Sequence, residues 1–551
     1  MLPRHRLALV LVCLCVLAGS LLLGGRWVYD SAPVRPDKGG TFVEAVAGRP
    51  QYVNPLLAQF NDVDRDLVAL IFAGLTKVGS GGRVEPDLAE SWDVSADGKT
   101  YTFTLRADRK FHNGQPVSAD DVLFTIALLQ DPAFPGLPDV AAQWQGISVK
   151  KQDERTVVFT LPEPYGPFLE QASLGILSSQ QLAGIPAAKL TQVPFNGLPV
   201  GAGPFKVSQL NVQQIVLQPD PNYPGPQTYL ESLVVKFYPT SRATLLAVQA
   251  GEATGARAVP AEELPRLRQD AHLALLSAPL EGRATVLFLN NRRAPFDTPA
   301  VRRAVALAVD RQALIGQALG GQGQPASAPI CPLSWGYTAG DQSGQDPKQA
   351  ATLLEEAGWL DTNGDGLRER GDEPLAVTLA TSDSPEQQAV ATYLTAQMSR
   401  LGFRVELQSQ TWEELRDAHL ATHDFDAALA DVWLPNYDPD VLALWHSSQA
   451  TSGLNLSGWQ NSTGDALLEQ GRQSWQQSAR VQAYAAFQKL FADEMPAVFL
   501  YYPTYTYVLR TDVQGVSLQP LLDPSERFRG FANWYTQTKK VLFTAVTGSK
   551  L

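Results

Sequence analysis

Cysteine is scarce in this chain of 551 residues, which carries only three. Two of them, Cys13 and Cys15, lie in an apolar segment near the N-terminus, and Cys331 is alone in the rest of the chain. No disulfide can therefore form within the part of the chain that follows the N-terminal segment.

Positive charge is also in short supply. The chain has 44 Lys and Arg against 56 Asp and Glu, a formal net charge of −12. No basic run follows the first few residues. A phosphate backbone would meet a surface of its own sign, so we expect no nucleic-acid partner.

The motifs of several common enzyme classes are missing as well. The sequence has no GxSxG nucleophile elbow, no HExxH zinc motif and no phosphate-binding P-loop. Cys331 has no histidine near it in the sequence, and paired carboxylates such as Glu355-Glu356 are typical of solvated helix faces. We expect no enzyme activity and no cofactor.

One long apolar run is present. The 19 residues from Leu7 to Gly25 carry no charge, Arg4 and Arg6 precede them, and Arg26 ends the run. This length falls between a signal-peptide core and a full membrane span. No small-x-small cleavage site or lipoprotein cysteine box follows, so we expect residues 1–30 to stay as a membrane anchor. The alternative is a cleaved signal. Both place the remainder outside the cytoplasm.

The length predicts two to four domains, and residues 31–40 have the polar, Pro/Gly-rich composition of a linker. Pro86 to Ile126 contains a β-hairpin, with strands Ser91–Val94 and Tyr101–Leu105 around the Asp97-Gly98 turn. Ser118 and Asp121 then form a capping box for a helix that stops before Pro132.

Further along, strands alternate with helices. Val286–Leu289 reads as a buried strand, and Thr298-Pro299 starts a helix. Between Leu375 and Leu407 a strand, a helix and a second strand follow one another with short connections. That alternation predicts a mainly parallel sheet. An earlier helix is expected over Leu67–Leu75.

Several long sequence segments resemble those of one protein family. They are PDLAESWDVSADGKTYTFTLRADRKFHNGQPVSADDV, NNRRAPFDTPAVRRAVALAVDR and DPKQAATLLEEAGW. In wording, order and spacing they resemble the family 5 solute-binding proteins of peptide and nickel ABC importers. The resemblance runs from about Thr41 to Trp534.

This resemblance implies an α/β, two-lobed periplasmic-binding-protein-like fold of class II type, with a small additional inserted α+β lobe. Lobe I is expected to comprise residues 41–76, 200–280 and 500–540. The inserted lobe is expected at residues 77–199, and lobe II, which closes over ligand, at residues 281–499.

The resemblance also implies a ligand site. In the peptide binders, a Trp-x-x-Asp segment supplies an aspartate that pairs with the ammonium group of the peptide. Here the equivalent position after Trp433 is Asn436, which can accept a hydrogen bond but carries no charge. Asp431 or Asp438 could substitute from nearby. The expected ligand residues are Gln59, Phe60, Asn61, Trp335, Trp433, Leu434, Pro435, Asn436, Asp438 and Tyr502.

The segment Asp361-Thr-Asn363-Gly-Asp365-Gly matches the opening of an EF-hand calcium loop. Its twelfth position is Asp372, shorter than the usual glutamate, and no clear helix follows. A structural turn is the expected interpretation. Asp361, Asn363 and Asp365 remain a weak candidate metal site.

These observations predict an extracytoplasmic, monomeric substrate-binding protein of an ABC importer. It would capture an oligopeptide or similar polar solute by lobe closure and deliver it to the membrane permease. The alternative is a ligand sensor that docks on a signalling membrane protein.

Overall fold

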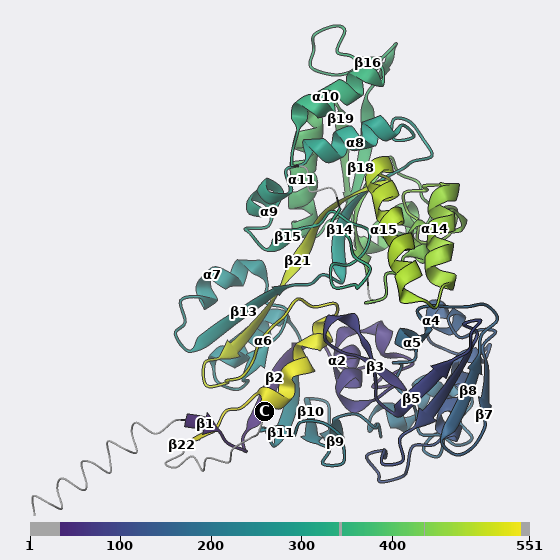
Figure 1. The fold of residues 1–551 in the computed structure, drawn as a ribbon. Helices are drawn as coiled ribbons and strands as arrows, with labels where there is room; N and C mark the ends of the chain where they lie inside the picture. The colour runs from purple at the N-terminus through teal and green to yellow at the C-terminus, as the bar shows by residue number, and fades with distance from the viewer. Residues whose placement is uncertain (1–33, 341–343, 435, 541–551) are drawn as a thin grey trace, which may run out of the picture.

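The computed structural model describes residues 34–340, 344–434 and 436–540. The predictions for Leu7–Gly25 and for Pro435 lie outside these residues. Figure 1 shows an upper body that narrows to a tip and a broader lower body. The names lobe I, inserted lobe and lobe II are kept for the ranges given above. Among the described residues, no helix combines the length and apolarity that a membrane crossing requires.

A single 12-stranded sheet passes through both bodies. Its main path, in spatial order, is β19 (Arg404–Gln410), β18 (Ala376–Ser382), β20 (Ala427–Trp433), β14 (Arg283–Leu289), β21 (Ala497–Arg510), β12 (Gly255–Ala256), β2 (Thr41–Ala47), β11 (Ser232–Tyr238), β10 (Gln214–Pro219) and β9 (Phe205–Leu210). Strands β13 (Leu273–Pro279) and β15 (Gly323–Pro325) also pair with β21.

Strand β21 joins the two bodies. Its first residues pair antiparallel with β14, from Ala497 to Tyr501, and the stretch from Thr504 to Arg510 pairs with β13. The short connection between β13 and β14 crosses at the same place, because the Leu280 N–H donates to the Pro503 carbonyl over 2.8 Å. A Cβ on Gly282 would lie 1.9 Å from the Leu522 carbonyl oxygen, so only glycine fits this crossing.

The predicted mainly parallel sheet is wrong. β18 runs parallel to β19 and to β20, as the alternation of strands and helices indicates. However, β14 runs antiparallel to both of its neighbours, β20 and β21. The error has a physical reason. β14 and β21 reach this sheet from distant parts of the chain, and local periodicity carries no information about such pairings.

Helices cover both faces of the sheet in lobe II. Helices α8 (Pro299–Ala308), α10 (Pro347–Glu356) and α11 (Pro385–Arg400) lie on one face, and α14 (Ser462–Gln473) and α15 (Gln477–Glu494) on the other. The side chains of β14 alternate between these layers: Leu287 packs in the α8–α11 cluster, and Phe288 packs in the α15 cluster. This strand is therefore buried on both sides.

The inserted lobe holds a separate four-stranded sheet in the order β5 (Ala89–Val94), β6 (Thr100–Leu105), β8 (Thr156–Thr160) and β7 (Ser148–Lys151). The predicted hairpin and its turn at Gly98 are confirmed. So is the capping box of α3 (Ala119–Gln130), where the Ser118 N–H donates to the Asp121 carboxylate over 2.9 Å.

Apart from several short 3₁₀ helices, the remaining elements are shorter or lie at the edges. They are β1 (Val34–Pro36), α2 (Asp62–Ile71), β3 (Thr76–Val78), β4 (Val84–Pro86), α4 (Pro138–Ala142), α5 (Phe168–Gln171), α6 (Ser241–Gln249), α7 (Leu264–Leu267), α9 (Arg311–Ala318), β16 (Glu369–Arg370), β17 (Glu373–Pro374), α12 (Trp412–Glu414), η6 (Leu415–Leu420), α13 (Leu442–Trp445), η8 (Pro524–Asn533) and β22 (Thr538–Lys540). The helix predicted over Leu67–Leu75 begins five residues earlier and ends four residues earlier, because Asn61 caps it by accepting the Asp64 N–H.

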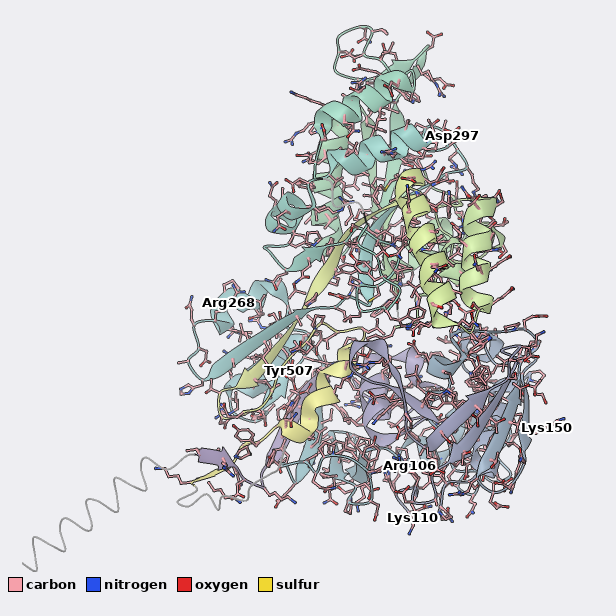
Figure 2. All side chains as sticks on the ribbon, viewed as in Figure 1. Arg106, Lys110, Lys150, Arg268, Asp297 and Tyr507 are labelled. Atoms are coloured by element: carbon pink, nitrogen blue, oxygen red, sulfur yellow. The ribbon has the colours of Figure 1, made fainter. Side chains whose placement is uncertain are left out.

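A buried ionic cluster lies in lobe I beneath β21. Figure 2 places Tyr507 inside the lower body, whereas Arg106, Lys110 and Lys150 lie on its outside. The fully buried Arg527 guanidinium donates to Glu44 over 3.0 Å and to Asp66 over 2.7 Å, and Tyr507 also donates to Glu44. Arg257 adds a second positive charge, 3.3 Å from Asp66. The two carboxylates and two guanidinium groups make the cluster neutral overall.

Candidate functional site

The candidate site is a hollow of about 190 Å³ in lobe II, where β18 and β20 end. We call it the strand-end hollow. Its lining comes from the start of β14, the carboxyl ends of β18 and β20, the first turn of α11, and the α12–η6 segment. The lining residues are Arg283, Ser382, Ser384, Glu386, Gln387, Trp412, Leu415, Leu429, Ala430 and Asp431.

Sheet geometry explains why these side chains meet. Parallel strands β18 and β20 end at one edge of the sheet, which is where open α/β sheets carry their ligand sites. Across the antiparallel pair of β14 and β20, Arg283 stands opposite Trp433 and Thr285 opposite Asp431. Residues directly opposite share a face, so these four side chains project from the same face as α11.

Asp431 is fully engaged by its neighbours. Its carboxylate accepts from the Arg283 Nε at 3.0 Å, from the Thr285 hydroxyl at 2.7 Å and from the Gln387 amide at 3.2 Å. Arg283 also donates through Nη2. A ligand ammonium would have to displace Arg283 to reach this carboxylate, so Asp431 is a poor replacement for the aspartate that the sequence lacks at position 436.

Asp438 is engaged as well. It is buried, and the Arg480 guanidinium donates to both of its oxygens over 2.6 and 2.5 Å. Burial alone would lower the pKa of Arg480, but the Asp438 carboxylate raises that pKa above its ordinary value. Trp335 lies against the same guanidinium, and the centre of its ring is 5.0 Å from the guanidinium carbon of Arg480. Asp438, which is buried, and Trp335, which is half-buried, thus both contact Arg480 beside the segment after β20.

The inserted lobe holds this segment from the other side. Glu170, in α5, accepts the backbone N–H groups of Tyr437 and Asp438 over 2.8 and 2.7 Å. A second contact joins the Gly166 N–H to the Arg472 carbonyl at 2.7 Å, where α14 stands above α4 and α5 in Figure 1. Burial, assisted by the negative charge of Asp438, raises the pKa of Glu170 to about 7.

Glu170 makes the stability of this interlobe contact depend on pH. Its pKa is raised from an ordinary 4.5, so between pH 4.5 and 7 the folded protein holds a proton that the unfolded chain has released. Stability therefore falls as the pH rises through this window. We expect Glu170→Gln to remove a pH-dependent component of about 1–3 kcal/mol from thermal unfolding measured between pH 4.5 and 8.

The matched control is Glu163→Gln in the same lobe, where the exposed carboxylate pairs with Lys99 at 3.0 Å. This control should follow the wild-type pH profile. If Glu170→Gln follows it too, Glu170 does not titrate in this contact.

The other residues expected from the sequence are scattered. Trp433 is 46% exposed at the end of β20, and Asn436 is exposed beyond it, whereas Leu434 is buried. Tyr502 is buried in β21 beside the lobe crossing. Asn61 caps α2, and Gln59 and Phe60 precede it in lobe I. None of these last three residues lines the strand-end hollow.

Sequence reasoning missed Arg283, Glu386, Gln387 and Trp412. One signal was available: Ser384-Pro385-Glu386 is a helix start directly after a strand, and such starts lie at the ligand edge of α/β sheets. The placement of Arg283 opposite Trp433 depends on long-range strand register, which no local pattern reveals.

The Asp361–Gly366 loop forms its own hydrogen bonds. The Asp361 carboxylate accepts the Gly364 and Gly366 N–H groups over 2.7 and 3.1 Å, and Asp365 accepts the Leu367 N–H at 2.8 Å. Asn363 bonds to Asp365 through both its amide nitrogen and its amide oxygen. These bonds are those of a tight turn, which is the interpretation we retain for this loop.

Two histidines, His419 and His423, are four residues apart, a spacing that can suit a metal. The His419 ring bonds to the Asp424 carbonyl, and the His423 ring bonds to the Gly453 carbonyl. Across residues 34–340, 344–434 and 436–540, no group of three or more His, Cys, Asp or Glu side chains is placed to hold a metal ion.

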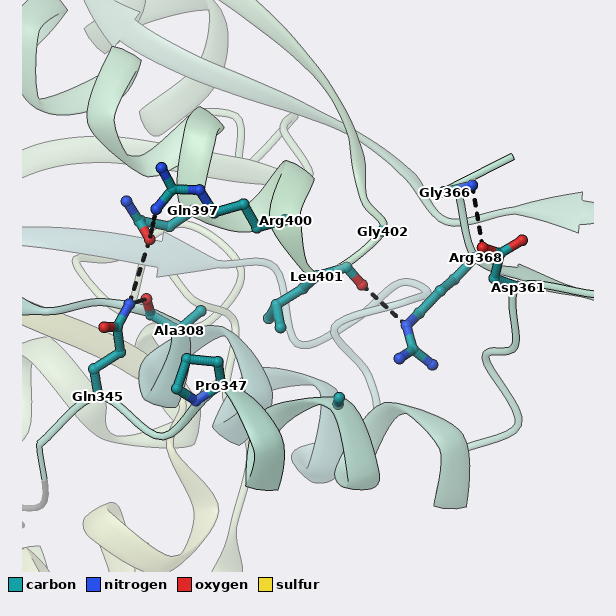
Figure 3. Close-up of a pocket in the computed structure, with 11 residues that line it drawn as sticks. Ala308, Gln345, Pro347, Asp361, Gly366, Arg368, Gln397, Arg400, Leu401 and Gly402 are labelled. Atoms are coloured by element: carbon teal, nitrogen blue, oxygen red, sulfur yellow. Dashed lines mark hydrogen bonds between the residues drawn. The ribbon is translucent and has the colours of Figure 1, made fainter. Parts of the chain in front are cut away.

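A larger hollow of about 420 Å³ lies toward the tip of lobe II (Figure 3). Gln345, Arg368 and Arg400 contribute polar groups, but Arg368 is tied to the Leu401 carbonyl at 3.0 Å and Gln345 to the Ala308 carbonyl at 2.8 Å. This hollow lies near the amino end of β18, because the Leu375 N–H bonds to the Arg368 carbonyl. Ligand sites of open sheets lie at carboxyl ends, so we favour the smaller hollow.

Comparison with known proteins agrees with this architecture. The sequence pattern of the bacterial extracellular solute-binding proteins, family 5 (middle), matches residues 83–453. The oligopeptide-binding protein AppA of Bacillus subtilis is 28% identical, over 89% of this chain and 91% of its own length. Di/tripeptide-binding protein 2 of Pseudomonas aeruginosa is 30% identical, over 80% and 85%.

A solved structure is similar across the same length. The structure of AppA from Bacillus subtilis in complex with a nonapeptide superimposes with a TM-score of 0.69 at 27% identity. The match covers 91% of this chain and 99% of that one.

Proposed function

This chain belongs to the bacterial extracellular solute-binding proteins of family 5, which are binding proteins rather than enzymes, and from that premise we propose its specific role. It captures an oligopeptide or a similar polar solute outside the cytoplasm, closes its lobes around it and delivers it to the permease of an ABC importer. The names of its relatives, which bind oligopeptides or di- and tripeptides, support this solute class.

The observation that carries the proposal is that the two chain segments which link the lobes lie side by side. Leu280–Gly282 and Tyr502–Pro503 are the two covalent connections of lobe II to lobe I, and a hydrogen bond of 2.8 Å joins them. Two short connections that lie side by side allow a hinge rotation, during which the Glu170 and Gly166 contacts with lobe II would change. The Leu434 N–H also donates to the Gly282 carbonyl at 2.8 Å, so the segment after β20 is attached to the hinge.

A solute drives such closure only if it binds the closed form more tightly than the open one. X-ray scattering on the protein with and without a pool of tripeptides tests this role. A smaller radius of gyration in the presence of the peptides is the expected result. Binding without any change in radius would contradict closure.

The exposed indole of Trp433 should contact the solute. We expect Trp433→Ala to weaken binding of any ligand by about 1–3 kcal/mol in calorimetry, because buried aromatic area is lost. Leu360→Ala is the matched control, since Leu360 is also 46% exposed but pairs with Glu369 of β16, away from the end of β20. Equal affinity of wild type and Trp433→Ala would place Trp433 outside the ligand site.

The N-terminal segment is proposed to hold the protein at the membrane. Leu7–Gly25 carries no charge and has no cleavage box after it. N-terminal sequencing of the mature protein should find the segment retained. A mature start between Arg26 and Ala32 would show that it is a cleaved signal.

A further inference from the structure

The strand-end hollow contains a buried acceptor without a partner. Gln387 is 7% exposed, and its amide nitrogen donates to Asp431 over 3.2 Å, which fixes the orientation of the amide. Its oxygen Oε1 has no hydrogen-bond partner among the described residues, although the side chain lines the hollow. Buried polar atoms are normally bonded, so this oxygen is available to a donor that enters the hollow.

The hollow also carries an excess of negative charge. Arg283 and Asp431 form an ion pair and cancel, which leaves the Glu386 carboxylate. The Tyr501 hydroxyl donates to Glu386 over 2.9 Å and steadies it against the sheet. Asp383, exposed and adjacent to the lining residues Ser382 and Ser384, adds to the negative field.

Apart from Ser382 and Ser384, the rest of the lining is apolar, and the space is small. Trp412 is 46% exposed, and Leu415, Leu429 and Ala430 complete the wall. An indole face stabilises both an aliphatic chain and a nearby cation. The volume of about 190 Å³ is below the roughly 300–1,000 Å³ of common small-molecule sites. It suits the end of one side chain, not a whole peptide.

The amino end of α11 does not turn the strand-end hollow from a site for cations into a site for anions. A free helix N-terminus attracts anions. Here Pro385 has no N–H, the Gln387 N–H bonds to the Ser384 hydroxyl at 3.3 Å, and Glu386 places a negative charge in the first turn. The helix end is therefore largely satisfied from within the chain.

We propose that the strand-end hollow binds the cationic end of the solute, an ammonium or guanidinium group on an aliphatic stem. The cation donates to Gln387 Oε1 and to the Glu386 carboxylate, and its stem packs on Trp412. This inference rests on the proposed function and narrows its solute class to basic peptides or peptide-like solutes. Glu386 is open to solvent, so its contribution grows when closure removes water.

The test uses pools of tripeptides with one variable residue among alanines, at each of the three positions. One pool carries lysine, one the uncharged, similarly shaped norleucine, and one glutamate. The full chain is incubated with equal amounts of all three pools, and retained peptides are identified by mass spectrometry. The variants are Glu386→Gln, which keeps the acceptor for Tyr501, and the control Glu406→Gln, an exposed glutamate of β19 outside the hollow.

We expect wild type to retain a lysine peptide about 10-fold better than its norleucine match. Glu386→Gln should lose most of this preference and Glu406→Gln should keep it. Equal retention of lysine and norleucine peptides, a preference for glutamate, or an unchanged preference in Glu386→Gln overturns the cationic subsite and leaves the proposed function standing. Retention of no peptide from any pool overturns both.

Discussion

Arg480→Met will destabilise the protein by about 3–5 kcal/mol, because it leaves the Asp438 carboxylate buried without a counter-charge. Asp438 and Arg480 are both buried and share two short hydrogen bonds. The substitution also frees the Gly471 carbonyl, which accepts from Arg480 Nε at 2.7 Å. Urea unfolding followed by circular dichroism measures the loss.

A double variant separates the charge effect from simple loss of packing. Asp438→Asn in the Arg480→Met background removes the stranded charge, so it should recover a large part of the lost stability. If the single variant costs less than about 1 kcal/mol and the second substitution changes nothing, the pair is not buried as described.

Arg480→Met should weaken ligand binding as well. Asp438 follows Trp433 by five residues, and its ion pair fixes the end of the segment that presents the indole. Once that end is loose, ligand must order the segment at the moment of binding, which costs free energy. Calorimetry at a temperature where the variant is still folded distinguishes this effect from unfolding.

Arg527→Met is expected to have an effect of similar or larger size on lobe I. The substitution leaves Glu44 and Asp66, both fully or nearly fully buried, as like charges that keep only the more distant Arg65 and the Arg257 ion pair as counter-charges. A loss of about 3–5 kcal/mol follows. Arg293→Met is the control, because that side chain is 45% exposed and its pair with Asp424 spans 3.2 Å. An exposed pair contributes about 0–1 kcal/mol.

Acid should partly rescue Arg527→Met. Burial raises the pKa of Glu44 even in the wild type, where Arg527 opposes the shift. Without Arg527 that pKa rises further, so the folded variant takes up a proton that the unfolded chain lacks at neutral pH. The stability gap to wild type should therefore narrow as the pH falls. A gap that is constant from pH 8 to pH 5 would contradict a buried ionic cluster.

Sequence reasoning was most successful where the signal lies within a few residues. The capping box at Ser118, the hairpin turn at Gly98 and the start of α8 at Pro299 all appear as expected. It was less successful for α2, whose predicted range began too late because Asn61 was not recognised as its cap. Short-range hydrogen bonds leave a pattern in the sequence, but side chains that serve two purposes are ambiguous.

The site could be predicted only in part. The family resemblance directed attention to Trp433–Asp438; Trp433 stands opposite Arg283 in the strand register but does not itself line the strand-end hollow, and its contact with ligand stays a prediction. The partner of Asp438 is 42 residues away in the chain, and the partner of its backbone N–H is 268 residues away. Such contacts depend on how the lobes pack, which composition and periodicity do not determine.

Retention of solute tests the central claim most directly. The full chain, purified in mild detergent, is incubated with a peptide digest, separated from unbound material and denatured, and the released solutes are identified by mass spectrometry. We predict about one equivalent of peptide or similar polar solute per chain, and much less from Trp433→Ala prepared in parallel. Wild type that retains no more than a heat-denatured sample, or Trp433→Ala that retains the same solute in the same amount, would contradict the account.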